Sequence, residues 1–166
     1  MGRVRVGLIG MGMIGKLHAE TMSRMTELEF VAASDIDAKH QKTAEEVGTK
    51  FYQSYEEMIG KEKLDGVVIA VPNELHLSVG ATCAEKKLHL LVEKPIASNL
   101  SDADCLVQAA KKNGVHLLIG HHRRHNPFIE ALRDTVRGGG IGKLVGVTVL
   151  WALYKPSDYF KGPFAW

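Results

Sequence analysis

The sequence has few of the features that mark several protein classes. Its 166 residues include 2 cysteines and 5 prolines, so no disulfide framework or collagen-like repeat is present. No apolar stretch reaches the roughly 18 residues that a membrane span requires. The 21 lysines and arginines nearly balance the 19 acidic residues, so no strong charge points to nucleic acid. We therefore expect a globular protein with neither a nucleic-acid nor a membrane partner.

The beginning of the chain has a superficial likeness to a secretory leader. Two arginines precede an apolar run, but four glycines interrupt that run and no small-residue cleavage site closes it. A buried first strand is the better interpretation. Cys83 and Cys105 lie in apolar-periodic segments, so we expect both to be buried free thiols, which suits a reducing compartment. We expect a cytoplasmic protein.

Short apolar runs alternate with helical patterns over the first 120 residues. Strands are expected at 3–9, 29–34, 50–52, 65–71, 88–92 and 115–119, and helices at 13–25, 38–47, 55–59, 73–86 and 101–112. Runs this uniformly apolar are buried on both faces, as in a parallel sheet with helices above and below. The sequence predicts an α/β fold over residues 1–121, a doubly wound parallel sheet of the Rossmann type.

The pattern changes after Gly120. A run of histidines and arginines leads into an expected helix at 127–136, and a glycine-rich connection leads on to a long apolar strand expected at 143–154. We interpret residues 122–166 as the incomplete beginning of an α+β second domain. A long apolar strand needs a neighbour. We therefore expect it to pair with its copy in another chain, which predicts a homo-oligomer.

The motif GMGMIG at 10–15 follows the first expected strand and opens the first helix. In a dinucleotide site, Gly10 permits the tight turn, Gly12 the approach of a pyrophosphate, and Gly15 the close packing of helix on strand. The other interpretation is a glycine-rich structural turn, with an unrelated aspartate capping the next helix. The position at the first strand–helix junction favours the dinucleotide site.

An acidic residue at the end of the second strand points to the same ligand. Asp35 lies about 20 residues beyond the glycine motif, where a carboxylate holds the 2′-hydroxyl of the adenosine ribose. The first backbone N–H groups of the helix, at Met13 and Ile14, are expected to face the phosphates. A carboxylate repels the 2′-phosphate of NADP, so NAD is the expected cofactor. Lys39 and His40 keep NADP open as the less favoured choice.

Three more groups follow strands at the edge of the sheet where ligands of open α/β sheets bind. PNELH at 72–76 follows the fourth strand, EKP at 93–95 the fifth and HHRR at 121–124 the sixth. With the glycine motif and Asp35, these groups resemble the Gfo/Idh/MocA family of NAD(P)-dependent sugar and polyol oxidoreductases. The resemblance covers the whole chain, but only the N-terminal half of a family member.

The resemblance implies an inositol-dehydrogenase-like enzyme, which transfers a hydride between nicotinamide and a secondary alcohol of a sugar or cyclic polyol. This chain would be its cofactor-binding portion. Lys94 of EKP would lie beside Glu93 at the nicotinamide, where its ammonium stabilises a developing alkoxide or relays a proton. The family also implies a cis bond before Pro95. From the residues alone, Lys94 is equally well explained as a surface lysine paired with Glu93. The alternative function is a non-catalytic dinucleotide-binding module or an inactive truncated fragment.

The loop after the fourth strand is the next part that the resemblance covers. It implies that Pro72, Asn73 and His76 bracket the ribose and nicotinamide of the cofactor. From the residues alone, Asn73 is equally well explained as an ordinary helix cap and His76 as a partly buried histidine in a first helical turn.

The basic run after the sixth strand is expected to face cofactor and substrate, with Arg123 or Arg124 contacting one of them. We predict no metal site there, because consecutive residues on a strand point to opposite faces and the two arginines repel a cation. Tyr154 is expected to line the substrate pocket. Packing against another part of the fold is an equally good explanation of this tyrosine.

Overall fold

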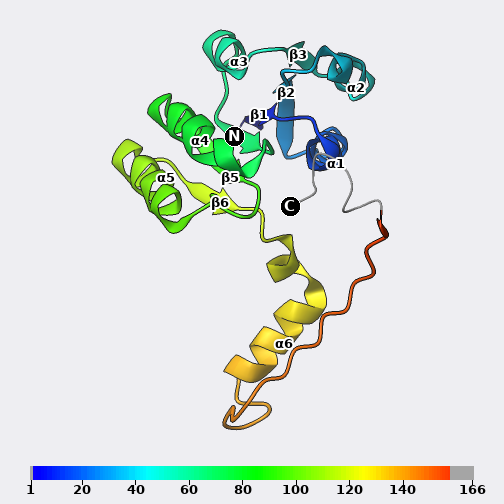
Figure 1. Ribbon diagram of the computed structural model, residues 1–166, viewed down its shortest axis with the longest axis vertical. Helices are drawn as coiled ribbons and strands as arrows, with labels where there is room; N and C mark the ends of the chain where they lie inside the picture. The colour runs from blue at the N-terminus through cyan, green and yellow to red at the C-terminus, as the bar shows by residue number, and fades with distance from the viewer. Residues whose placement is uncertain (1, 158–166) are drawn as a thin grey trace. The chain divides into compact units, whose positions relative to one another are not determined.

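Six parallel strands form one sheet in the order β3-β2-β1-β4-β5-β6 (Figure 1). In chain order they are β1 (Val4–Ile9), β2 (Leu28–Ser34), β3 (Lys50–Tyr52), β4 (Gly66–Ile69), β5 (His89–Val92) and β6 (Leu117–Ile119). The computed structural model describes residues 2–157. The sheet lies in the first of two compact units, residues 1–122 and 123–166. Its strand order is that of the Rossmann fold, which confirms the predicted fold class.

Helices cover both faces of the sheet. On one face, α1 (Met13–Met22) and α2 (Gln41–Glu46) contribute Ala19 and Ala44 to a buried cluster around Leu8. On the other face, α3 (Tyr55–Lys61), α4 (His76–Glu85) and α5 (Leu100–Asn113) pack against the strands. The buried residues that these three helices contribute are Met58, Val79, Cys83, Ala84 and Leu106.

Burial on both faces explains why the strands are apolar throughout. All four residues of β4, GVVI, are buried, and so are the last three of β1. A sheet with helices on both faces leaves no solvent-facing side for polar residues in its central strands. None of the helices in the described part of the chain is both long enough and apolar enough to cross a membrane.

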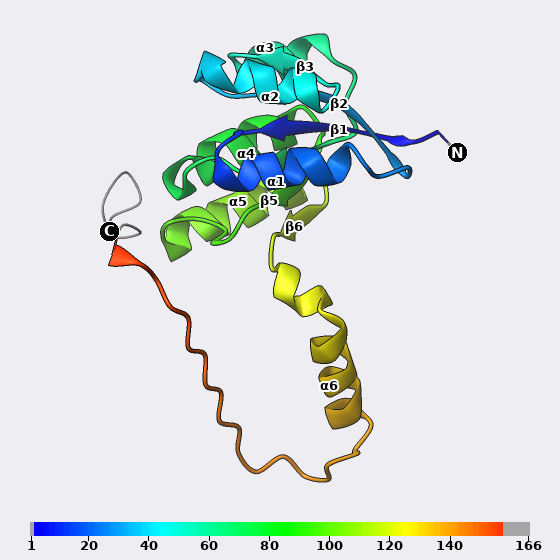
Figure 2. The same ribbon diagram turned by 90° about the vertical axis from the view of Figure 1, so that its right-hand side faces the viewer.

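The strand β1 is the point at which the chain changes direction across the sheet. It pairs with β2 on one side and β4 on the other, with Ile9 opposite Ser34 and Ile69. Figure 2 shows β1 leading into the loop from which α1 runs back along the sheet. In open α/β sheets, ligands bind beyond the carboxyl ends of the strands at such a reversal.

Several element boundaries differ from the sequence predictions by a few residues, and two predicted helices begin with a separate 3₁₀ turn. The first helix ends at Met22, with Ser23 as its C-cap, rather than at residue 25. The helix predicted at 38–47 divides into a 3₁₀ turn, η1 (Ala38–His40), and α2. In the same way, the helix predicted at 73–86 becomes η2 (Asn73–Leu75) and α4.

The second unit contains α6 (Pro127–Arg137), which confirms the helix predicted at 127–136. The side chain of Asn126 caps it by accepting a hydrogen bond from the Phe128 amide at 2.9 Å. A 3₁₀ turn, η3 (His122–His125), precedes this helix. The prediction of a strand at 143–154 is wrong, because residues 144–156 are neither helix nor strand. A strand forms only beside a partner that takes up its backbone hydrogen bonds, and no strand of residues 2–157 pairs with this segment.

Candidate functional site

The glycine loop between β1 and α1 needs its first and third glycines for steric reasons. Gly10 has φ +91°, in the region that favours glycine, and a Cβ there would lie 2.7 Å from the carbonyl oxygen of Ala70. A Cβ at Gly15 would overlap the carbonyl oxygen of Gly10. These contacts hold α1 close against the carboxyl ends of β1 and β4.

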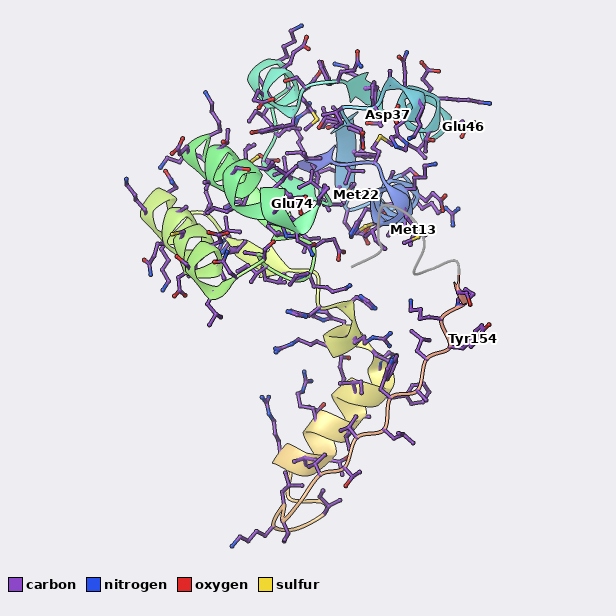
Figure 3. All side chains as sticks on the ribbon, in the orientation of Figure 1. Met13, Met22, Asp37, Glu46, Glu74 and Tyr154 are labelled. Carbon is purple, nitrogen blue, oxygen red and sulfur yellow. The ribbon has the colours of Figure 1, made fainter. Side chains whose placement is uncertain are left out.

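The second glycine of the loop is different, because nothing lies within 4 Å of where its Cβ would be. Gly12 is the N-cap of α1, and no side chain of the described residues caps the helix there. The first turn has no acidic residue, and the side chains of Met13 and Ile14 are exposed. Met13 and Met22, which mark the two ends of α1, are labelled in Figure 3. The loop therefore offers free backbone N–H groups and open space at the positive end of a helix, which suits an anion.

Asp35, directly after β2, is tied to this loop. Its Oδ2 accepts a hydrogen bond from the backbone N–H of Met11 at 2.7 Å, and its Oδ1 accepts one from Asp37 at 2.9 Å. A carboxylate offers about four acceptor positions, so both oxygens retain capacity for ligand hydroxyls. The carboxylate thus lies beside the glycine loop, where a bound ribose is expected.

Of the two basic residues that keep NADP open, Lys39 is paired and His40 is buried. Lys39 forms an ion pair with Asp37, and its hydrogen bond holds the pKa of that carboxyl below its ordinary value. The same hydrogen bond raises the pKa of Lys39. His40 is buried. Neither side chain is a free, exposed cation beside Asp35.

The loop after β4 has an exposed part and a buried part. Pro72 and Asn73 are exposed, and the side chain of Asn73 caps neither η2 nor α4, so the helix-cap explanation of this residue is wrong. His76, the first residue of α4, is fully buried. Its Nδ1 lies 2.8 Å from the carbonyl oxygen of Pro95, and its Nε2 lies 3.0 Å from that of Val71. The imidazole therefore bridges this loop to the EKP segment, and a ligand would reach it only by displacing a carbonyl.

The EKP segment follows β5. The bond between Lys94 and Pro95 is cis, as the resemblance implies. Lys94 is exposed, and its ammonium has no ion-pair partner among residues 2–157. Glu93 pairs instead with His18 of α1, with 2.9 Å between Nε2 and Oε1. Lys94 does lie at the surface, but the explanation that pairs it with Glu93 is wrong.

His18 belongs to the site although no sequence pattern predicts it. Its pattern on α1 gives no sign of a role, because its partner Glu93 lies 75 residues further along the chain. The available signal was its place on the helix that the glycine loop opens, one turn beyond Gly15. Only the fold shows that this turn lies next to the end of β5.

The residues expected to contact substrate lie in the second unit. Arg123 and Arg124 belong to η3, and the guanidinium of Arg123 lies 4.1 Å from the centre of the Trp151 ring. The side chain of Tyr154, labelled in Figure 3, is 87% exposed. In the described part of the chain, no group of three or more histidine, cysteine or acidic side chains could hold a metal ion. The roles of these three residues stay predictions.

Comparison with known proteins identifies relatives of this chain. The model of the Gfo/Idh/MocA family, described as an oxidoreductase family with an NAD-binding Rossmann fold, matches residues 4–121. The rhizopine catabolism protein MocA of Rhizobium meliloti is 33% identical over 162 residues, covering 97% of this chain and 51% of its own length. The myo-inositol 2-dehydrogenase of Thermotoga maritima is 31% identical, covering 95% of this chain and 48% of its own length.

A solved structure agrees with the sequence comparisons. The WlbA dehydrogenase of Bordetella pertussis, determined in complex with NADH and UDP-GlcNAcA, superposes with a TM-score of 0.79 and 26% identity. The match covers 85% of this chain and 44% of that one. The chain thus spans about half the length of the curated relatives it matches.

Proposed function

Since the chain belongs to the Gfo/Idh/MocA family of oxidoreductases, we propose that it binds a nicotinamide dinucleotide at the carboxyl edge of its sheet. In this proposal, it takes part in hydride transfer to or from a secondary alcohol. The observation that carries the proposal is the joined geometry of Asp35 and the glycine loop, at the point where strand order reverses. A glycine-rich turn with a purely structural role would not need the hydrogen bond from the Met11 N–H to the Asp35 carboxylate, nor the open space beside Gly12. Both features favour a ligand site.

Different segments at this edge of the sheet would bind different parts of the dinucleotide. The N–H groups at Gly12, Met13 and Ile14 would hold the pyrophosphate, and Asp35 would accept hydrogen bonds from the adenosine ribose. Pro72 and Asn73 lie exposed at the end of β4 and would bracket the second ribose and the nicotinamide. The buried ring of His76 would act on the cofactor by holding this loop in place.

We propose NAD rather than NADP as the cofactor. A 2′-phosphate would place its negative charge against the Asp35 carboxylate. Lys39, whose charge interacts with that of Asp35, is already paired with Asp37. Two neighbouring negative charges disfavour binding of the phosphate unless a free cation offsets their repulsion.

Lys94 would supply the polar chemistry of the reaction. When bound, the nicotinamide ring accepts or donates the hydride. The ammonium of Lys94 is exposed and without a carboxylate partner in the described residues, so it is free to donate a hydrogen bond to an alcohol oxygen. A cation there stabilises the negative charge that develops on the alcohol oxygen as the hydroxyl proton passes to solvent water. Glu93 would contribute by positioning this lysine.

The substrate class follows from the relatives. Their names include a myo-inositol dehydrogenase, so a cyclic polyol or a sugar is the substrate that we propose. Arg123, Arg124 and Tyr154 would contact it. We also propose that residues 1–121 form the cofactor domain, that 122–166 begin a second domain, and that the protein is a cytoplasmic homo-oligomer.

An assay with NAD and a panel of cyclic polyols tests the proposed reaction. We expect NADH to form with at least one polyol, and Lys94→Ala to lower the rate by roughly 100-fold or more without weakening NADH binding. Lys112→Ala, at an exposed lysine of α5, is the matched control and should not change the rate. A chain that binds NADH but turns over no polyol would instead be a non-catalytic dinucleotide-binding module.

A further inference from the structure

A hydrogen-bonded bridge joins the dinucleotide helix to the proposed catalytic lysine. His18 lies in α1, and its Nε2 is 2.9 Å from Oε1 of Glu93. The other oxygen of that carboxylate, Oε2, accepts the backbone N–H of Lys94 at 3.2 Å. One carboxylate therefore contacts both the helix that the glycine loop opens and the backbone of the lysine.

The surroundings of Glu93 are shaped for this arrangement. Its own backbone N–H donates to the carbonyl of Ile69 at 2.9 Å, which fixes the residue to the end of β4. A Cβ at Gly120, after β6, would lie 2.9 Å from Oε1, so the glycine leaves room for the carboxylate. The side chains of His18 and Glu93 are only 24% and 17% exposed, so water competes weakly for their bond.

The opposite side of Lys94 is held as well. The carbonyl of Pro95 lies 2.8 Å from Nδ1 of the buried His76. The backbone on both sides of Lys94 is thus fixed by histidines, one from α1 and one from α4. Only the side chain of Lys94 remains free to meet a substrate.

We propose that His18 is a positioning residue, which acts through Glu93 to fix the backbone of Lys94 relative to the dinucleotide-binding helix. The inference rests on the proposed function, in which the phosphates lie at the start of α1 and the lysine lies beside the nicotinamide. Without His18, the Glu93 carboxylate gains rotamer freedom, and the N–H of Lys94 loses a fixed acceptor. The lysine would then no longer hold its place against the bound ring.

Amide hydrogen exchange at Lys94, followed by NMR, tests the bridge without cofactor or substrate. We expect His18→Leu to accelerate exchange at this amide by about fivefold or more, because its acceptor is no longer held. His18→Gln, whose amide nitrogen replaces Nε2, should stay within about twofold of the unchanged chain. His116→Leu, at an exposed histidine before β6, is the control for loss of an imidazole and should have no effect at Lys94.

A purely structural role for His18 would give a different pattern. It would accelerate exchange across α1 and β5 together and lower the melting temperature, with no selective effect at Lys94. That result, or an unchanged Lys94 amide in His18→Leu, would overturn the inference.

Protection of the Lys94 amine by NADH carries the test to the site itself. In the unchanged chain and in His18→Gln, saturating NADH should slow acylation of Lys94 by at least about fivefold, measured against Lys112 in the same digest. In His18→Leu the protection should fall below about twofold, while NADH binding changes by less than about threefold, since the glycine loop is intact. Equal protection of the Lys94 amine in His18→Leu and His18→Gln would overturn the inference. Absence of NADH binding by the unchanged chain would instead overturn the proposed function, and the exchange experiment would still decide the role of His18.

Discussion

At the scale of single residues, the candidate site separates side chains that hold loops from side chains that face outward. Asp35 and His76 bond to backbone groups of neighbouring loops. Asn73 and Lys94 are exposed at the same edge of the sheet. Residues of the first kind fix the shape of the site, and residues of the second kind are available to a ligand. Asp35 belongs to both kinds, because each of its oxygens accepts one backbone hydrogen bond and keeps a further acceptor position.

Gly15 gives the sharpest steric prediction at this scale. We expect Gly15→Ala to lower the free energy of unfolding by about 1–3 kcal/mol, because its Cβ would overlap the carbonyl of Gly10. The same substitution should abolish NADH binding, because it displaces the glycine loop. Gly60→Ala, in α3 with nothing within 4 Å of the new Cβ, is the control and should stabilise the chain slightly. Chemical denaturation of both variants measures the difference, and equal stability would contradict the packing described.

The two thiols are predicted to react very differently. Burial raises the pKa of Cys83 to about 12. Cys105 is exposed on α5, so the expectation of a buried thiol is wrong for this residue. Since the thiolate is the reactive form, a disulfide reagent such as DTNB should modify one thiol in the native chain and the second only after unfolding. Cys105→Ser should remove the fast reaction. A fast reaction of two thiols in the native chain would show that Cys83 is accessible.

At the scale of elements, a carboxylate links α3 to β3. Glu62, the C-cap of α3, accepts hydrogen bonds from Lys50 at 2.8 Å and Tyr52 at 2.6 Å. The bond from Lys50 and then that from Tyr52 hold the pKa of Glu62 below its ordinary value. The strand β3 is only three residues long, so this contact contributes to holding it at the sheet edge.

The pH dependence of stability tests that link. Because the pKa of Glu62 is lower in the folded chain, the stabilisation is present above the unfolded value, about 4.3, and is lost as pH falls through the folded value. We expect Glu62→Gln to cost on the order of 1 kcal/mol at neutral pH and nothing in strong acid. Glu20→Gln, at an exposed residue of α1, should show neither effect. An equal cost for Glu62→Gln at both pH values would refute the electrostatic origin.

Elements also show where sequence patterns suffice and where they fail. The run GVVI predicts a buried central strand, because burial on both faces leaves no choice of residue type. The apolar run at 143–154 predicts a strand for the same reason, yet none forms there. A strand depends on a partner, and local composition carries no information about that partner. The bridge from His18 to Glu93 escapes prediction for a related reason, since only the folded sheet brings the two residues together.

At the scale of the whole molecule, the two compact units divide the proposed roles. Every residue proposed to bind the cofactor lies within residues 1–122, together with Lys94, which would contact the reacting alcohol. The other three residues proposed to contact substrate, Arg123, Arg124 and Tyr154, lie in 123–166. We therefore expect a shortened chain of residues 1–122 to unfold cooperatively and to bind NADH within about threefold of the full chain. Circular dichroism melting and fluorescence titration measure both properties. Loss of binding in a folded shortened chain would show that the second unit contributes to the cofactor site.

Titration of the 166-residue chain with NADH and with NADPH shows whether Asp35 and the glycine loop form an NAD site. We predict saturable NADH binding about tenfold or more tighter than NADPH binding, which corresponds to roughly 1.4 kcal/mol of repulsion at the 2′-phosphate. Asp35→Ser should weaken NADH binding and reduce the difference in affinity between NADH and NADPH. An absence of saturable NADH binding would show that these residues form no dinucleotide site. Tighter binding of NADPH would show that Asp35 does not exclude a 2′-phosphate.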